Sequence, residues 1–254
     1  MSKINVNTWE PESSTALTMG ASGDTTTVPS GASLVVASGA TINITGATQT
    51  GFPSAGFADV HADASSGSET YTVPADITKL LVIITGGGGG GGNGVLASQY
   101  GSGGGAAGTV MARVTVVAGD TITIAVGAAG GVNVAGGDST FTHATGSGSF
   151  DTITGPGGVA GVTLTTNTPA DPTAPTVGAS NAGIAIKGGR PAPAGNVYNS
   201  GAASFWGGGG IGSSAVTAKT GTAFGSGGGG GNYISGKVAG AAGADGVCFI
   251  MEFK

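Results

Sequence analysis

The sequence predicts an all-β protein in which short strands alternate with runs of glycine. No stretch combines a helical period of apolar residues with capping residues, so helices are not expected. Several short segments rich in β-branched residues are bounded by glycine, as strands commonly are. Of the 254 residues, 55 are glycine, and many of them gather in runs. We therefore expect a short N-terminal fibrous β region, trimeric, followed by a glycine-rich β-sandwich with polyglycine-II-like segments.

The strongest strand signals lie in the second part of the chain. Residues 79–85 contain five consecutive apolar residues, which predicts a buried strand. Two further strands are expected at 109–117 and 121–126, and Ala118-Gly119-Asp120 between them is typical of a hairpin turn. The final strand, 246–253, is expected beside the strand at 79–85. Together they predict a compact β domain whose two ends are tied to each other.

Seven glycine-dense segments interrupt the chain from residue 86 onward, although ordered glycine loses more backbone entropy than any other residue. Such runs favour an arrangement in which bare backbones approach closely. Extended left-handed helices with three residues per turn have no internal hydrogen bonds, so neighbouring copies can pair their N–H and C=O groups. We expect a rigid layer with the intervening segments as loops at its ends. The seven segments are 86–94, 101–108, 127–137, 155–161, 207–212, 225–231 and 239–246.

Residues 1–50 show a short repeat in which glycine recurs at positions 23, 31, 39 and 46. Each interval holds a short β-type segment, which suits a β-solenoid or three interleaved chains. The segments carry too few large apolar residues to bury a core within one chain, so three chains around one axis are expected. A meander of surface hairpins is the alternative. We divide the chain into this N-terminal β-repeat and trimerisation region (1–50), a linker (51–69) and a glycine-rich domain (70–254).

Composition and residue spacing argue against several classes of function. The net charge is −5 with only eight Lys and Arg, so the sequence predicts no basic patch that could bind the phosphates of a nucleic acid. Cys248 is the only cysteine, and its apolar flanks predict a core residue rather than a metal ligand. His61 and His143 stand apart from any acidic or cysteine cluster, so we expect no metal, no cofactor and no enzymatic activity. The N-terminus lacks the apolar core of a signal peptide, which predicts folding in a cytoplasm.

Segments between the glycine runs carry the candidate receptor-binding residues, because aromatic and Asn side chains on rigidly held loops suit contacts with sugars or proteins. Phe205 and Trp206 have an alternative role, as core residues that close the edge of the glycine layer. Near the N-terminus, Trp9, Glu10 and Pro11 are candidates for attachment to a partner protein, with Trp9 as a cap on the trimer's first layer as the alternative. The receptor-binding candidates are Tyr100, Tyr198, Asn199, Phe205, Trp206 and Tyr233.

A strand at 81–85 that runs into Gly86–Gly92, followed by Gly103–Gly108 and Gly119–Gly127, resembles the glycine-rich domain of phage tail proteins over about residues 70–254. The opening, Ile4–Ser13, is similar to the leader of fibre proteins in marine phages, including those of cyanobacteria. The polyglycine packing resembles the detachable adhesins on long tail fibres of T-even-like phages, whose loops contact the bacterial surface. Unlike those adhesins, this chain carries its own fibrous leader, which favours a self-contained trimeric fibre.

The resemblance implies a bacteriophage tail fibre protein. Such a protein would be a homotrimer in the virion, assembled in the host cytoplasm and joined to the phage tail, baseplate or an adaptor protein through its N-terminus. Its loops would bind a bacterial surface receptor, either a glycan or an outer-membrane protein. A structural fibre shaft or adaptor without receptor binding is the alternative. An ice-binding protein is a third interpretation, disfavoured because the glycine spacing is irregular.

Overall fold

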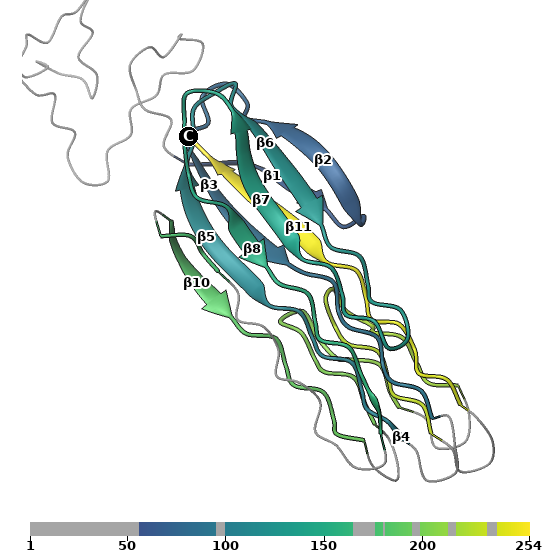
Figure 1. Ribbon diagram of the computed structural model, residues 1–254. Coiled ribbons are helices and arrows are strands. Elements are labelled where there is room, and N and C mark those ends of the chain that lie inside the picture. The colour runs from purple at the N-terminus through teal and green to yellow at the C-terminus, as the bar shows by residue number, and fades with distance from the viewer. Residues whose placement is uncertain are drawn as a thin grey trace, which may run out of the picture. The chain divides into compact units, whose positions relative to one another are not determined.

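The computed structural model describes residues 56–94, 100–164, 176–179, 181–194, 199–212, 217–232 and 238–254 (Figure 1). They belong to one compact unit, Pro53–Lys254. Within them the chain forms eleven strands and no helix, which confirms the predicted all-β class, and so no described helix could cross a membrane. The trimeric β region predicted at 1–50 lies outside the described residues. The strands are β1 (Phe57–Asp63), β2 (Gly67–Thr72), β3 (Lys79–Thr85), β4 (Tyr100–Gly101), β5 (Thr109–Thr115), β6 (Thr121–Val126), β7 (Ser139–Thr145), β8 (Ile153–Gly155), β9 (Thr163–Leu164), β10 (Ala182–Ile186) and β11 (Val247–Phe253).

Two antiparallel sheets form a sandwich, and a third, two-stranded sheet (β4-β9) lies at the far end of the glycine segments (Figure 1). The five-stranded sheet has the order β1-β11-β3-β5-β10, and the four-stranded sheet has the order β2-β6-β7-β8. The last strand, β11, pairs with β3 over its whole length, from Val247 opposite Thr85 to Phe253 opposite Lys79. This pairing confirms the neighbour relation predicted for these two strands.

The core of the sandwich comes from the alternation of side chains along each strand. In β3, Leu80, Val82 and Ile84 are fully buried, whereas the residues between them face away from the core. Each large apolar side chain buried in this way contributes about 1.5–3 kcal/mol. Cys248 is also fully buried, as its flanks predicted. The other fully buried core side chains include Val110, Ile122, Ile124, Phe141, Ile153 and Ile250.

The turn at 118–120 joins the two sheets and does not form the predicted hairpin. Strand β5 before it belongs to the five-stranded sheet, and β6 after it belongs to the four-stranded sheet. The buried carboxylate of Asp120 organises the crossing, because it accepts hydrogen bonds from the backbone N–H groups of Val117 (2.9 Å), Ser147 (3.0 Å) and Gly148 (3.3 Å). The prediction was wrong because both strands carry an apolar face, and a crossing between sheets lets both faces meet in one core.

Part of the segment predicted as a linker belongs to the sandwich. Residues 57–63 form β1, which pairs with β11 from Phe57 opposite Phe253 to Asp63 opposite Cys248. Strand β2 follows and pairs with β6. The strand signal of β1 is weak in the sequence because its large apolar residues are few and it lies at the edge of the sheet.

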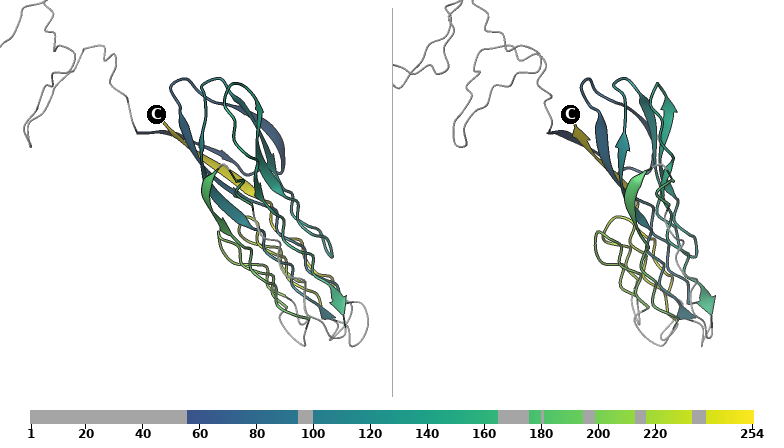
Figure 2. Two further views of the ribbon diagram at one scale, coloured as in Figure 1. Left: turned by 60° about the vertical axis from the view of Figure 1, so that its left-hand side comes forward. Right: turned by 90° about the vertical axis from the view of Figure 1, so that its left-hand side faces the viewer.

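The glycine runs continue from the sandwich as a bundle of extended segments (Figure 2). Segment 86–94 lies at a centre of this bundle: successive N–H groups donate in turn to three neighbouring segments, and successive C=O groups accept from three others. Six neighbours around one segment are what a helix with three residues per turn and no internal hydrogen bonds allows. The predicted polyglycine-II-like pairing therefore takes place within one chain. The acceptors lie in 102–108, 134–137 and 238–244, and the donors in 130–133, 158–161 and 228–231.

A second centre of the bundle is segment 225–232. Its Gly228 N–H donates to the carbonyl of Gly89 (2.9 Å) and its Gly231 N–H to the carbonyl of Gly92 (2.8 Å). The two central segments are therefore bonded to each other, and they share 238–244 as a common neighbour. This double centre makes the bundle a continuous hydrogen-bonded body rather than a set of loops.

Close approach, and not backbone conformation, requires glycine in segment 86–92 of the bundle. No glycine of segment 86–92 has a φ in the left-handed region. A Cβ atom at Gly90 would overlap the carbonyl oxygen of Gly131. Ala106 and Ala107 are fully buried in a neighbouring segment, so a methyl group is accepted at some positions. The steric demand is thus specific to each position.

We expect Gly90→Ala to lower the free energy of unfolding by about 2–3 kcal/mol, because overpacking a close-packed interior costs about 1–3 kcal/mol or more. Gly208→Ala is the matched control, since a Cβ atom at Gly208 meets nothing within 4 Å. Urea denaturation of both variants measures the difference. Equal stability of the two variants would contradict the close approach of backbones at Gly90.

We expect Asp120→Asn to lower the free energy of unfolding by about 2 kcal/mol at neutral pH, because hydrogen bonds to a buried charge contribute about 1.5–3 kcal/mol. Burial by itself would raise the pKa of Asp120, but the hydrogen bonds from Val117, Gly148 and Ser147, with His143 nearby, hold that pKa below its usual value. A lowered folded-state pKa gives a stabilisation that is present above the unfolded-state value of about 3.9 and lost as the pH falls through the folded-state value. Denaturation curves across the acid range should therefore show the two proteins converging below about pH 4. A gap that stays constant into strong acid would exclude this role.

Candidate functional site

The structure separates the predicted receptor-binding residues into two regions. Tyr100 and Asn199 lie at the end of the bundle remote from the sandwich, where β4 is labelled in Figure 1. Phe205 and Trp206 lie at the opposite end of the bundle, against the five-stranded sheet. The predicted residues that lie outside the described part of the chain are Trp9, Glu10, Pro11, Tyr198 and Tyr233.

Asparagine side chains close the remote end of the bundle. The Asn93 side-chain oxygen accepts a hydrogen bond from the Gly240 N–H (3.1 Å), and the Asn133 side-chain oxygen accepts from the Asn93 N–H (3.3 Å). Asn133 has a φ of 59° in the turn at 131–134, a conformation that Asn tolerates better than most residues. These side chains satisfy backbone donors at the point where neighbouring glycine segments end.

Tyr100 and Asn199 have different environments at this end. Tyr100 is half-buried in β4 and pairs with Leu164 of β9. Asn199 is only 3% exposed, and its Nδ2 donates to the carbonyl of Gly101 (2.6 Å), so it supports the end of the bundle from inside. Exposed apolar side chains here include Val134, at 54%, and Ile211, at 61%, beside Asn199; neither was predicted as a binding residue from the sequence. The position of each as a large apolar residue inside a glycine run is the signal that could have found them.

At the sandwich end, the turn at 204–207 places Trp206 over the five-stranded sheet. The indole Nε1 donates to the hydroxyl of Thr85 (2.9 Å), and the indole ring lies 5.2 Å from the ring of Phe249. Phe205 packs edge-on against the indole at 5.1 Å and is 46% exposed. Trp206 therefore closes the junction between sheet and bundle, which matches the alternative role that the sequence left open for it.

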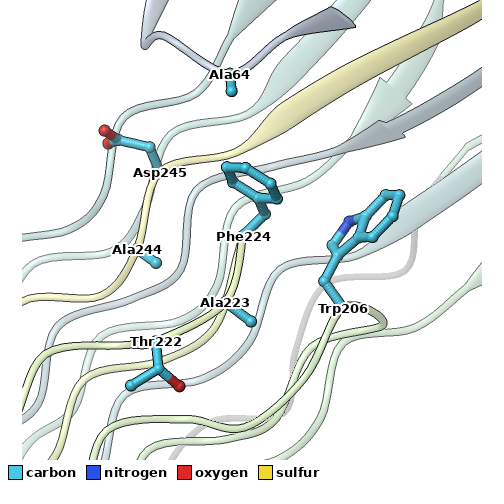
Figure 3. Close-up of a pocket in the computed structure, with 7 residues that line it drawn as sticks. All are labelled: Ala64, Trp206, Thr222, Ala223, Phe224, Ala244 and Asp245. Atoms are coloured by element: carbon cyan, nitrogen blue, oxygen red, sulfur yellow. The ribbon is translucent and has the colours of Figure 1, made fainter.

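A pocket of about 470 Å³ opens beside this aromatic turn. Figure 3 shows the ring of Phe224 between Trp206 on one side and Asp245 on the other. The two aromatic rings are nearly perpendicular, at 89°, with centroids 6.3 Å apart. Thr222 Oγ1 donates to the carbonyl of Gly208 (2.7 Å), and Asp245 accepts from the N–H of Ala129 (2.7 Å). Aromatic faces beside a hydroxyl and a carboxylate can bind a sugar ring or an apolar side chain.

Phe224 and Asp245, which lie beside Trp206 in this pocket, were not predicted from the sequence. Phe224 is separated from Trp206 by eighteen positions and belongs to a different glycine-dense stretch. Asp245 comes from the last glycine run, just before β11. Only the folding of the bundle brings these segments together. An isolated aromatic residue next to a glycine run, as in Ala223-Phe224-Gly225, is the one signal that the sequence offers.

Ionisable side chains buried in the sandwich include those of Tyr71, Glu252 and Cys248. Tyr71 donates its hydroxyl to Glu252 (2.7 Å), and burial together with this carboxylate raises the pKa of Tyr71. Burial likewise raises the pKa of the Cys248 thiol, which keeps it protonated at neutral pH. Among the described residues there is no group of three or more His, Cys, Asp or Glu that could hold a metal ion.

A family model described as a glycine-rich domain matches residues 62–251, which include nearly all of the sandwich and the glycine bundle. The matched residues make up well over half of the 254 in the chain. No curated protein matches the sequence.

We expect Trp206→Ala to lower the free energy of unfolding by about 2–3 kcal/mol, somewhat less than the 3–5 kcal/mol typical of a fully buried aromatic residue. Trp206→Phe should cost only about 1 kcal/mol, because it keeps the contact with Phe249 and loses the hydrogen bond to Thr85. Chemical denaturation of the two variants separates these contributions. An alanine variant as stable as the wild type would exclude a structural role for the indole.

Proposed function

The chain belongs to the glycine-rich domain family, and we propose that it is a bacteriophage tail fibre protein that attaches the virion to its host as a homotrimer. In this proposal the remote end of the glycine bundle binds a bacterial surface receptor, either a glycan or an outer-membrane protein. Residues 1–50, with Trp9, Glu10 and Pro11, join the phage tail, baseplate or an adaptor protein. The resemblance of the sequence to fibre proteins and adhesins of phages supports this role.

The observation that carries the proposal is the construction of the bundle from bare backbone. Its two central segments, 86–94 and 225–232, pair their backbone groups with neighbours on several sides, so they have little freedom to move. Binding residues are commonly found on loops held by such a rigid scaffold. Because the interior consists of backbone, residues at the remote end can differ from one fibre to another without changing the scaffold. A scaffold that tolerates such changes suits a binding surface whose receptor differs from host to host.

The trimer adds strength to weak contacts. Three copies of a binding end on one particle raise the overall affinity by orders of magnitude when all can engage at once. At the remote end, Tyr100 and Val134 are suited to such contacts, since both are large and at least partly accessible. No covalent chemistry is part of this proposal.

A structural role as fibre shaft or adaptor is the second candidate. The position of Phe205 and Trp206 favours it, because these two aromatic residues lie at the sandwich and not at the remote end. In that role the chain would connect the tail to a separate receptor-binding protein. The two candidates differ in whether the purified protein binds host cells by itself.

We expect a fluorescent fusion of the full chain to stain host cells, and Tyr100→Ala combined with Val134→Ser to reduce the staining at least tenfold. Val117→Ser is the matched control, because Val117 is 43% exposed in the turn at the opposite end of the sandwich. Flow cytometry across a panel of candidate hosts measures the staining. Undiminished staining by the Tyr100 and Val134 double variant would place the receptor contact elsewhere. No staining of any host by the wild type would favour the adaptor role.

A further inference from the structure

The five-stranded sheet is apolar on the face that points away from the core as well as on the face that points into it. Leu81 and Ile83 of β3 face outward and are half-buried. The strand register places each of them in a row with one residue from every other strand of the sheet. The first row is Ala62, Phe249, Ile83, Met111 and Ile184, and the second is Val60, Met251, Leu81, Arg113 and Ala182.

In the described part of the chain, this outer face is covered at one end. There Trp206 lies over Thr85, next to the glycine bundle. Farther along, Ile184 is 64%, Val60 47% and Phe57 61% exposed. A sheet with one face in water normally alternates apolar and polar side chains. A contiguous apolar surface of this kind marks an interaction site.

Resting on the homotrimer of the proposed function, we infer that this outer face packs against the β1 edge of another copy of the chain. In a cyclic trimer every contact joins two different patches, one from each copy. The outer face carries Lys79 and Arg113 and has no acidic residue in its rows. Strand β1, at the edge of the same sheet, carries Asp59 and Asp63, which the register places on the face opposite to Val60. The two patches are therefore complementary in charge.

A hollow lies on the outer face at the end of the sheet that is remote from the glycine bundle, where β3 begins and β11 ends. The hollow, of about 340 Å³, opens between Lys79, Leu81, Arg113 and Phe253. Neither Lys79 nor Arg113 is paired with a carboxylate within the described residues. A guanidinium group binds a carboxylate through two parallel hydrogen bonds. We therefore place Asp59 of one copy at Arg113 of the next.

The test is a crosslink between copies in the full chain carrying both Asp59→Cys and Arg113→Cys. Within one chain these positions belong to strands separated by β11 and β3, so about three strand spacings of roughly 4.8 Å keep them apart. A disulfide needs Cα atoms within about 7 Å, so it can form only between copies. We expect mild oxidation to give covalent dimers and trimers on a denaturing gel. Asp59→Cys with Thr142→Cys, on the other sheet, is the control and should give none.

The mass of the same protein in solution separates the possible failures. A trimer by light scattering that forms no crosslink would overturn the contact proposed here and leave the trimer standing. A monomer would overturn the trimer of the proposed function together with its contact.

A second measurement tests whether the outer face is covered at all. Ile184→Cys in the trimer should react with a thiol reagent at least tenfold more slowly than Val134→Cys, which lies at the remote end. Cys248 is buried and does not interfere. Equal rates would show an open face and reject the inference. Slow labelling of Ile184→Cys without the crosslink would mean that another part of the chain covers the face, which also rejects it.

Discussion

Hydrogen bonding between bare backbones is the constraint on which the rest of the structure depends. The bundle forms only where segments meet in register, and the sandwich sets that register. Val247 lies opposite Thr85 in the β11–β3 pair, and three residues farther along each chain segment the Gly88 N–H donates to the carbonyl of Ala244 (2.8 Å). The strands therefore act as a clamp that aligns the glycine segments, and the order of strands determines which segments become neighbours.

This construction confines side-chain chemistry to the two ends of the bundle. Its interior offers N–H and C=O groups that are already paired with one another. In the sandwich, the polar side chains within the core are also paired, as Tyr71 is with Glu252. A protein built in this way presents shape and surface side chains to a partner, which is why a recognition role agrees with its architecture.

The sequence predicted the parts of the fold that depend on local composition. The apolar run at 79–85 indicated a buried strand, and the glycine runs indicated a backbone bundle. Both features can be read directly from the order of residues in the sequence. The crossing at Asp120 was missed, since Gly-Asp fits a hairpin turn as well as a turn between sheets. The position of Trp206 was left open because its partner Thr85 is 121 residues away. Asn199 similarly bonds to Gly101, which is 98 residues distant, and neither contact has a local signal.

The distribution of side chains also determines where copies of the chain can meet. Segments 86–94 and 225–232 are nearly devoid of side chains, and their backbone groups are paired with other segments, so they offer little for a specific contact with another molecule. The sandwich is different, because its outer face is apolar in a chain of which only 8% of the residues are charged. An interface at the sandwich leaves the remote ends of the bundles free. Assembly and recognition can then use opposite ends of the same domain, so that strengthening one does not obstruct the other.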